Sequence, residues 1–370
     1  MSAPSTAVRL NPFKGCEGPE GDAVPWNRYG RLLARRPDFT LDPLLHAGCY
    51  YVQDSSAQYV GYVFRKLLTD NNLGSASGKR LSVLDLCAAP GGKTGDLAAS
   101  LRERCGSNFL LVANEVIRRR AAVLRDNMAR WGDQQVKVVS ADPSFFGRRM
   151  EGVFDIVLAD VPCSGEGMFR KDPKALEDRS EQTVELCAAR QKRILADMWP
   201  ALREGGILIY STCTYEEREN DDNLEWAARN LGGEIFAPEN PFASFGVRST
   251  RSGVILRAGE VPGEGQWVGA LRKTSTQPPY EPREMPFELR RDEADRVLEI
   301  NYSPEYPVVE LSVEQALKYL HRDSLYLPEA PRGVIIAAYR GHPLGLAKNL
   351  GSRCNNLLPK GRRILMDINI

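Results

Sequence analysis

The chain has 370 residues, which is enough for two or three domains. Apolar residues make up 42% and charged residues 26%, a composition typical of a globular protein with a proper core. The 49 basic and 48 acidic side chains nearly cancel, so the net charge of +1 neither favours nor excludes a nucleic-acid partner. No apolar run approaches the length of a membrane span, and the first residues lack an apolar signal region. We therefore expect a cytoplasmic protein without a membrane segment.

Residues 1–75 precede the first strand that we expect in the core. They contain the segment "VPWNRYGRLLARRPDF", in which arginines are interleaved with aromatic residues. Such a mixture suits contact with a nucleic acid, through phosphates and bases. We expect a short N-terminal module of the RNA-binding type here.

Between residues 76 and 274, short apolar runs alternate with segments of helical character. The runs are bounded by Gly, Asp or Pro, as in strands that are buried on both faces of a parallel sheet. Helices are expected at 94–104, 116–131 and 180–202. The expected strands are 81–86, 109–115, 136–142, 154–160 and 206–212. The pattern predicts an α/β core with a parallel sheet.

The composition changes after this core. Residues 275–294 are rich in proline and charge and lack periodicity, so we expect a linker. Residues 295–370 then form a compact segment with strand-like runs. These runs are "YPVVELS", "GVIIAAYR" and "RRILMDI". A small C-terminal β-rich domain is predicted.

The eight cysteines lie at positions 16, 49, 87, 105, 163, 187, 213 and 354, and none forms a C-x-x-C pair. With only three histidines in the chain, a metal site is not expected. A disulfide framework is implausible in a large chain without a secretory signal. Most of these cysteines are expected to be small buried apolar residues.

The stretch "VLDLCAAPGGKT" resembles a phosphate-binding P-loop at first sight. The P-loop pattern requires a glycine where Cys87 stands, and Pro90 removes a backbone N–H donor. The alternative is a glycine turn at the carboxyl edge of a parallel sheet, where α/β folds bind cofactors. We favour this second interpretation.

Four consecutive predicted strands end in an acidic residue, namely Asp85, Glu115, Asp142 and Asp160. One such acid would be explained as a helix cap, but four along one sheet edge are harder to explain this way. Carboxylates suit a cofactor with hydroxyls, an amino group and a positive centre, such as S-adenosylmethionine. A dinucleotide fits less well, since the turn has no G-x-G-x-x-G pattern.

Two cysteines follow the last two strands of this series. Cys163 lies in "DVPCSGEGMFRKDP", where many amine methyltransferases have an aromatic residue, and Cys213 lies in "YSTCTYEEREN". Carbon 5 of a pyrimidine becomes nucleophilic only after a group adds to carbon 6, and a thiolate is well suited to this addition. A second thiol can remove the proton from carbon 5 after methyl transfer.

The motifs "DLCAAPGGKT", "DVPCSGEGMFRKDP" and "YSTCTYEEREN" resemble the NOL1/NOP2/Sun family of RNA 5-methylcytosine methyltransferases. The similarity extends to "DPLLHAGCYYVQDSSA" and "HPLGLAKNLGSRCNNLLPKGRRI", as in the bacterial 16S rRNA (cytosine-C5) methyltransferase F group. The resemblance implies a Rossmann-like class I methyltransferase core at 76–274 and a PUA-like RNA-binding domain at 295–370. Family members carry more sequence before "AVRLNPFK".

The resemblance also implies roles for individual residues. Cys213 would attack carbon 6, and Cys163 would assist product release. Asp160 would contact the cytosine and S-adenosylmethionine, and Lys93 would contact the base. The remaining cofactor-binding residues would be Cys87, Ala88, Ala89, Pro90, Gly91, Gly92, Lys93, Glu115 for the ribose and Asp142 for the adenine. The side chain of Cys87 is expected to pack the turn while its backbone contacts the cofactor.

The expected partner is small-subunit ribosomal RNA, either free or in the assembled 30S subunit. Residues 331–370 contain seven Lys or Arg and one Asp, a local charge of about +6 that suits a phosphate backbone. Arg118, Arg119 and Arg120 are weaker candidates, because they also fit an exposed helix face. Two other hypotheses remain open, namely an RNA-binding assembly factor without activity and an amine methyltransferase.

Overall fold

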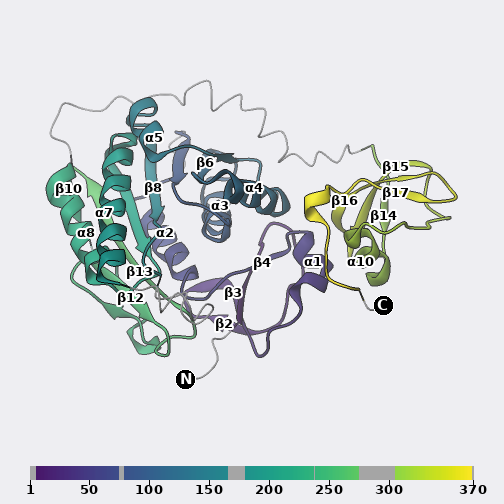
Figure 1. The fold of residues 1–370 in the computed structure, drawn as a ribbon, viewed down its shortest axis with the longest axis horizontal. Helices are drawn as coiled ribbons and strands as arrows, with labels where there is room; N and C mark the ends of the chain where they lie inside the picture. The colour runs from purple at the N-terminus through teal and green to yellow at the C-terminus, as the bar shows by residue number, and fades with distance from the viewer. Residues whose placement is uncertain (1–5, 75–78, 166–179, 237, 275–304, 369–370) are drawn as a thin grey trace.

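A computed structural model of the chain describes residues 6–74, 79–165, 180–236, 238–274 and 305–368. The predicted linker at 275–294 lies outside the described residues. So do residues 166–173 of the motif "DVPCSGEGMFRKDP". Figure 1 shows a large α/β body beside an N-terminal module, with a separate C-terminal lobe that adjoins the module. In the described part of the chain, no helix combines the length and apolar composition that crossing a bilayer requires.

The body is built on a mixed sheet in the order β11-β12-β13-β9-β8-β5-β6-β7. Five neighbouring strands run parallel: β5 (Leu81–Asp85), β6 (Phe109–Asn114), β7 (Val136–Val139), β8 (Phe154–Asp160) and β9 (Leu202–Thr212). They coincide with the five predicted apolar runs, because strands covered on both faces must be apolar along their whole length. The α/β core is therefore confirmed.

The sheet continues with antiparallel strands that complete the body. β13 (Gly265–Lys273) pairs with β9 on one side and with β12 (Gly253–Arg257) on the other. β11 (Arg248–Ser249) and β10 (Gly233–Ile235) extend this edge. The alternation of strands and helices did not predict this antiparallel addition, because no helix separates β12 from β13.

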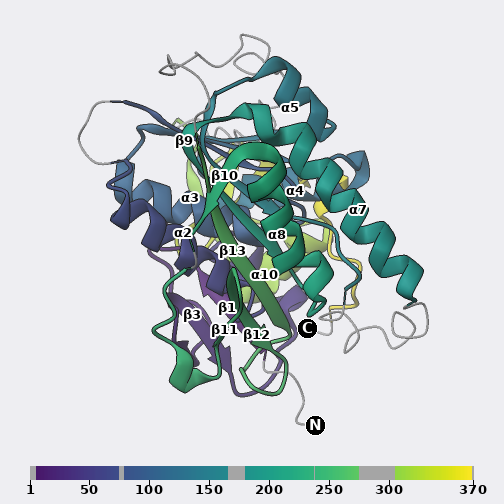
Figure 2. The same cartoon turned by 90° about the vertical axis from the view of Figure 1, so that its left-hand side faces the viewer.

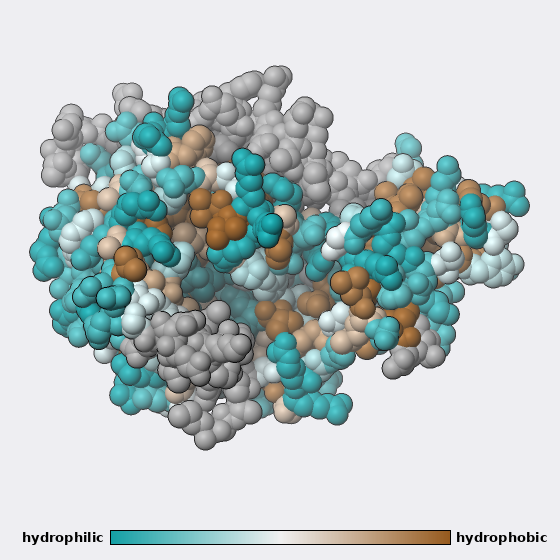
Figure 3. All heavy atoms as spheres, in the orientation of Figure 1, coloured by the Kyte–Doolittle hydropathy of each residue, from teal (hydrophilic) through white to brown (hydrophobic). Residues whose placement is uncertain are grey.

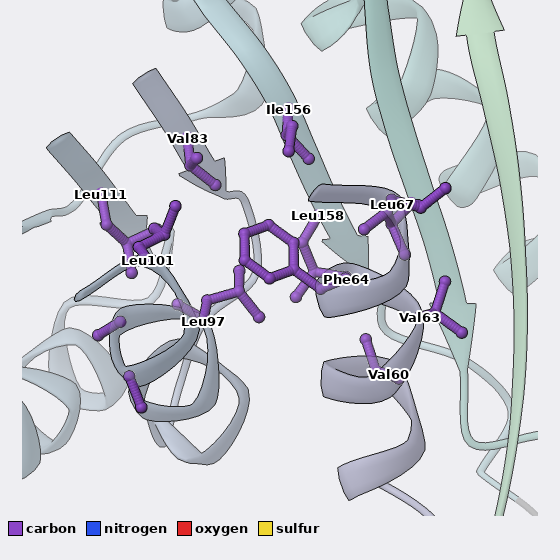
Figure 4. Packing of buried hydrophobic residues seen from close by; sticks show 14 of the residues in the cluster. Val60, Val63, Phe64, Leu67, Val83, Leu97, Leu101, Leu111, Ile156 and Leu158 are labelled. Carbon is purple, nitrogen blue, oxygen red and sulfur yellow. The ribbon is translucent and has the colours of Figure 1, made fainter. Parts of the chain in front are cut away.

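Helices cover both faces of the sheet and give the body three layers (Figure 2). One face packs against α2 (Gln58–Asp70), α3 (Gly92–Cys105) and α4 (Arg118–Trp131). The other face packs against α5 (Pro143–Arg149), α7 (Glu181–Met198) and α8 (Asp221–Ala227). Figure 4 shows the first of these contacts, where Phe64 of α2 lies beside Leu97 of α3 and Leu158 of β8.

The N-terminal module is a four-stranded antiparallel sheet in the order β2-β3-β1-β4. Its strands are β1 (Thr6–Leu10), β2 (Asp22–Val24), β3 (Asn27–Leu33) and β4 (Tyr50–Val52), and the short helix α1 (Pro43–His46) precedes β4. Asp42 caps α1 by accepting a hydrogen bond from the backbone N–H of Leu44. From β4 the chain passes into α2, so the module is joined directly to the core.

Within residues 305–368, the C-terminal domain has a sheet in the order β14-β15-β16-β17 that is accompanied by the helix α10. The strands are β14 (Val308–Glu310), β15 (Gly333–Tyr339), β16 (His342–Asn349) and β17 (Cys354–Asn356), and the helix is α10 (Val313–His321). The prediction of a strand at "RRILMDI" is wrong, because this segment begins in the 3₁₀ turn Lys360–Arg362 and joins no sheet. Ile364 is instead buried against the domain core.

The N-terminal module and the C-terminal domain share one hydrophobic cluster, although they lie at opposite ends of the chain. Val8, Leu44 and Tyr50 from the module are buried with Tyr319 and Leu344 from the domain. Figure 3 shows apolar patches near the middle of this face, where the parts of the molecule meet around a hollow. These contacts position the C-terminal domain beside the module.

A polar contact and a covalent bond strengthen this region. Arg362 of the C-terminal domain pairs with Asp126 of α4 at 3.3 Å. Within the module, Cys16 and Cys49 form a disulfide. The sequence did not predict this bond, because two cysteines 33 residues apart give no sign of their proximity.

Candidate active site

The two cysteines that follow β8 and β9 meet at the carboxyl edge of the sheet. Cys163 lies three residues after the end of β8, and Cys213 follows directly after β9. Because the two strands are parallel neighbours, their loops leave the sheet side by side. The Sγ atoms are 3.1 Å apart, and both side chains are half-buried. Nucleophile and base candidates are thus in contact.

Hydrogen bonds between the two loops hold this geometry. The backbone N–H of Ser164 donates to Glu219 Oε2 at 3.1 Å, and the hydroxyls of Ser164 and Thr214 are 3.2 Å apart. Gln191 of α7 donates from Nε2 to the carbonyl of Pro162 and to Glu219 Oε2. These hydrogen bonds therefore fix the loops after β8 and β9, which carry the two cysteines, relative to each other.

Lys93 and Asp160 form an ion pair next to the cysteines, with Nζ and Oδ2 2.9 Å apart. Asp160 also accepts hydrogen bonds at Oδ1, from the hydroxyl of Ser211 at 2.7 Å and from Gln266 Nε2 at 3.3 Å. Burial lowers the pKa of Lys93, but the Asp160 carboxylate more than offsets this, so the pKa is raised. Lys93 is therefore a permanent positive charge beside the thiols.

The surroundings make the two thiols unequal. The Cys163 S–H donates to Cys213 and so lowers the pKa of Cys213, and Lys93 lowers it further, although burial and Asp160 act in the opposite direction. The same hydrogen bond, together with burial, raises the pKa of Cys163. The pKa of Cys213 therefore lies below that of Cys163, so Cys213 is the more readily ionised thiol and the better nucleophile.

The glycine turn between β5 and α3 is held from several directions. Gly91 has φ = 113°, a left-handed conformation, and a Cβ there would lie 2.8 Å from Met128 Cε. From α4, Arg120 donates to the carbonyl of Ala89 and Asn127 donates to that of Pro90. The turn is thus a rigid platform at the start of α3.

A cavity of about 170 Å³ opens at this turn. Seven predicted site residues line it: Cys87, Ala88, Ala89, Pro90, Gly92, Lys93 and Asp160. Burial raises the pKa of the Cys87 thiol, and its side chain packs against the core beneath the turn. Cys87 therefore remains a neutral packing residue.

Three predicted cofactor residues, Gly91, Glu115 and Asp142, do not line this cavity. Glu115 is 2% exposed, accepts a hydrogen bond from the backbone N–H of Ile117, and pairs with Arg120 at 3.1 Å. Asp142 is the N-cap of α5, where Oδ1 accepts from the backbone N–H of Ser144. The hydrogen bonds from Ser144 lower the pKa of Asp142. Both carboxylates follow neighbouring strands along the same edge.

Sequence reasoning missed the contribution of the N-terminal module to the cavity. Tyr51, Gln53 and Asp54, which follow or belong to β4, form the wall opposite the glycine turn. Asp54 accepts three backbone hydrogen bonds, and burial raises its pKa to about 6. The segment "YYVQDSSA" was part of the family resemblance, but nothing in its spacing showed that it faces the turn.

One group of potential metal ligands occurs among the described residues, although the sequence predicted no metal site. Cys16, Cys49 and His342 place their ligand atoms within 4.8 Å of one another. The two sulfurs are bonded to each other, and His342 Nδ1 is 3.5 Å from Cys16 Sγ. This group lies away from the glycine turn, between the N-terminal module and the C-terminal domain.

Comparison with protein families assigns both main parts of the chain. Residues 75–231 match the model described as 16S rRNA methyltransferase RsmB/F, and residues 306–364 match the model of the methyltransferase RsmF PUA domain. The predicted PUA-like domain is therefore confirmed. S-adenosylmethionine is the cofactor of this class of enzymes, as predicted.

Curated relatives point the same way. The chain is 32% identical over 267 residues to ribosomal RNA small subunit methyltransferase F of Pectobacterium atrosepticum, an alignment that covers 70% of this chain and 52% of that protein. The aligned part thus spans about half the length of this relative. The protein of the same name from Shewanella halifaxensis is 27% identical over 92% of this chain and 85% of its own length.

Solved structures support the fold. A methyltransferase homologue from Pyrococcus horikoshii superimposes with a TM-score of 0.57 at 25% identity, covering 74% of this chain and 87% of that protein. NSun6 from the same organism, determined with SFG, gives a TM-score of 0.53 at 24% identity over 67% of this chain and 58% of that one. With a class I methyltransferase core, a PUA domain and relatives of one name, the chain belongs to the RsmB/F family of 16S rRNA methyltransferases.

Proposed function

We propose that the chain is an S-adenosylmethionine-dependent RNA (cytosine-C5) methyltransferase that acts on 16S rRNA through a covalent bond between Cys213 and carbon 6 of the target base. The main support is the contact between the Cys163 and Cys213 sulfurs beside the Lys93–Asp160 pair. Two thiols of unequal pKa, next to a fixed charge pair, suit a reaction that needs a nucleophile first and a base later.

The residues at the sheet edge fit the cofactor. The turn from Cys87 to Lys93 would surround it, Glu115 would accept from the ribose hydroxyls, and Asp142 would lie near the adenine. The buried Oδ1 atom of Asp85 has no hydrogen-bond partner in the protein, which indicates a polar ligand group in this place. When bound, S-adenosylmethionine supplies a methyl group on a positively charged sulfur.

Cys213 performs the first step in this proposal. Its thiolate adds to carbon 6 of the cytosine, and the ring electrons move to carbon 5, which thereby becomes nucleophilic. The hydrogen bond from Cys163 and the charge of Lys93 keep Cys213 ionised at a lower pH than an ordinary thiol. The sequence alone could assign these two roles only through the family resemblance, whereas the geometry gives a physical reason for them.

Asp160 and Lys93 hold the base in this proposal. Asp160 contacts the cytosine, and the adjacent Lys93 ammonium stabilises the negative charge that develops on the ring when the thiolate adds. The hydrogen bond from Ser211 and the ion pair with Lys93 fix the carboxylate in place before the base arrives. Such pre-organisation means that little reorganisation is needed during the reaction.

Cys163 acts after methyl transfer. Once Cys213 is bonded to carbon 6 it no longer carries a negative charge, so the main obstacle to ionising Cys163 is removed. Cys163 first gives up its own proton to water. Its thiolate then takes the proton from carbon 5, the electron pair reforms the ring double bond, and Cys213 leaves as a thiolate. Cys213 thus acts as the thiolate before methyl transfer, and Cys163 acts as the thiolate after it.

The C-terminal domain would supply most of the affinity for RNA. Its basic side chains include Arg332, Arg340, Lys348, Arg353 and Lys360. Phosphate contacts of this kind are sequence-independent and weaken as salt rises. A cytosine within a helix could not reach Cys213, so the target must be unpaired or flipped out of the stack.

A labelling experiment tests this proposal. The protein is incubated with radiolabelled S-adenosylmethionine and either free 16S rRNA or 30S subunits, and the RNA is digested to nucleosides. Label in 5-methylcytidine is the expected result. Cys213→Ala should show none, while the matched control Cys105→Ala, at the far end of α3, should retain activity.

The same experiment separates the competing hypotheses. Label in another nucleoside or in protein would indicate an amine methyltransferase. No label with either substrate, together with tight RNA binding, would indicate an assembly factor. Either result would refute the cytosine-C5 proposal.

A further inference from the structure

Three side chains that the proposed reaction does not use meet where the N-terminal module adjoins the C-terminal domain. They are Cys16 and Cys49 of the module and His342, the first residue of β16. Their ligand atoms, two Sγ and one imidazole nitrogen, all lie within 4.8 Å of one another. Thiolate sulfur and imidazole nitrogen are the donors that zinc prefers in proteins.

The distance between His342 and Cys16 fits two ligands of one ion. In a tetrahedral zinc site the Zn–S bond is about 2.3 Å and the Zn–N bond about 2.0 Å, so a sulfur and a nitrogen on the same ion are roughly 3.5 Å apart. His342 Nδ1 is 3.5 Å from Cys16 Sγ. A disulfide sulfur has no hydrogen to donate and is a weak acceptor, so a hydrogen bond gives little reason for this approach.

Backbone contacts hold the two cysteines near each other independently of the bond between them. Cys49 is 1% exposed and directly precedes β4, and its carbonyl accepts from the backbone N–H of Asn11 at 2.8 Å. Asn11 Nδ2 donates to the carbonyl of Gly48 at 3.0 Å. These bonds fix the start of the loop after β1, which carries Cys16, against the segment that carries Cys49. The sulfurs therefore stay neighbours when the disulfide is reduced.

The hairpin between β15 and β16 places His342. This residue pairs with Tyr339 across the turn, and Gly341 within the turn donates its backbone N–H to Glu310 Oε2 at 3.1 Å. The hairpin packs against the module through the hydrophobic cluster that the two parts share. Cys16 and His342 are partly exposed, so an ion can enter the site from solvent.

The charges of the site suit a dication. Two thiolates cancel the charge of a zinc ion, and an imidazole binds it in the neutral form. Lys14 and Glu310, one of each sign, are the charged side chains that act on His342. The Lys14 ammonium is itself held by the carbonyl of Arg130 at 2.7 Å. The surroundings therefore add no net charge to the site.

We propose that the reduced pair Cys16 and Cys49, together with His342, binds a zinc ion whose fourth ligand is water. A thiol reductant first exchanges with the disulfide: the S–S bond breaks, the reductant is oxidised to its own disulfide, and two protein thiols form. These thiols lose their protons to water as the ion binds. Reoxidation by a disulfide of the same class reforms the S–S bond and releases the ion.

The oxidised and reduced states connect different parts of the molecule. The disulfide joins two segments of the N-terminal module, whereas the zinc ion also joins the module to the C-terminal domain through His342. Zinc thus fixes the domain that would contact RNA beside the module that adjoins the core. This inference goes beyond the proposed function, because no step of methyl transfer uses these three residues.

The test measures zinc binding by the full chain. It uses Cys163→Ala and Cys213→Ala together as the parent, because the thiols of the candidate active site would compete for the same ion. The parent, kept under a phosphine reductant without oxygen, should retain one equivalent of zinc through gel filtration, and the oxidised parent should retain none. Cobalt(II) should give the strong visible absorption of tetrahedral thiolate coordination. Excess magnesium should not displace either ion, because it prefers oxygen ligands.

Variants of the parent assign the ligands. His342→Gln and Cys16→Ser should each weaken zinc binding at least about 100-fold, since losing a ligand costs no less than losing a residue that supports one. The controls are His321→Gln, on α10 of the same domain, and Cys105→Ala, at the far end of α3. Both should bind zinc normally. Zinc should raise the Tm of the reduced parent and of both controls but not that of His342→Gln.

Any of three results would overturn the inference and leave the proposed function intact. The first is a reduced parent that retains no zinc. The second is equal retention by the oxidised parent, which would place the ion elsewhere. The third is unchanged affinity in His342→Gln, or a loss that His321→Gln shares, since neither would assign a ligand to His342. Failure of the wild-type chain to methylate RNA would overturn the proposed function without affecting the zinc site.

Discussion

The molecule contains two close pairs of cysteines whose surroundings differ sharply. Cys163 and Cys213 lie at the carboxyl edge of the sheet, 3.1 Å apart, joined by a hydrogen bond. Cys16 and Cys49 lie in the N-terminal module next to the C-terminal domain, joined by a covalent bond. Each pair connects segments that are distant in the sequence.

The charged neighbours account for the difference in chemistry. The first pair has Lys93 beside it, which lowers the pKa of Cys213, and it faces a site where a base can approach. The second pair has His342 as its polar neighbour and sits beside the cluster shared by the module and the C-terminal domain. Under the proposed function the first pair takes part in catalysis, whereas the second pair is a crosslink, and this comparison can be tested on both pairs.

The largest effect is expected from removing the nucleophile. Cys213→Ala should reduce methyl transfer by at least about 1,000-fold, since the covalent step is lost entirely. Cys16→Ala, measured in the same radiolabel assay, should stay within about threefold of the wild type. Similar losses of methyl transfer in Cys213→Ala and Cys16→Ala would contradict the functional difference between the two cysteine pairs.

Removing the partner of the nucleophile should give a different result. Cys163→Ala should form the bond between Cys213 and RNA but fail to release it, so a covalent protein–RNA species should accumulate on a denaturing gel. Because the variant lacks the S–H that lowers the pKa of Cys213, this species should form more slowly near neutral pH and faster as pH rises. Multiple turnovers by Cys163→Ala would contradict the role assigned to Cys163.

Lys93 should affect the same ionisation through its charge. Lys93→Met removes a cation that lowers the pKa of Cys213, so formation of the RNA adduct at neutral pH should fall about 10-fold for each unit by which that pKa rises. The rate of adduct formation by Lys93→Met should then increase with pH over a range in which the rate of the wild-type protein no longer changes. Lys79→Met, which removes an exposed lysine paired with Asp155, is the matched control. A pH profile identical to that of the wild type would refute this role.

The second cysteine pair should affect stability instead. Cys16→Ser should lower the free energy of unfolding by about 2–4 kcal/mol without reductant, because the disulfide restricts a long loop in the unfolded chain. Dithiothreitol should have the same effect on the wild type and none on the variant, as measured by urea unfolding. A similar response to reductant in both proteins would show that the crosslink does not contribute.

Most of the core could be predicted from the sequence, because strands buried on both faces are apolar throughout and leave a clear signal. The loops after β8 and β9 could also be placed, since parallel strands end at one edge. The antiparallel pairing of β12 with β13 and the absence of a strand at "RRILMDI" could not be predicted, because strand direction and sheet membership depend on neighbouring segments. The predicted domain limits at 75, 275 and 295 and the residue roles remain predictions.

Gln53 shows why part of the candidate site was missed. Its place opposite Asp85 depends on how the N-terminal module packs against the core, and the direction of its amide depends on Arg9. Neither contact has a periodic or motif-like signal. The same holds for Cys16 and Cys49, which come together only when β4 pairs with β1.

The order of the amino acids already shows which types of residue follow each core strand, and hence which chemistry is available at the sheet edge. The packing of the segments sets which thiol has the lower pKa, which amide group faces the cavity and which cysteines bond to each other. These properties depend on distances between atoms from separate segments, and such distances arise only when the hydrophobic clusters bring the segments together.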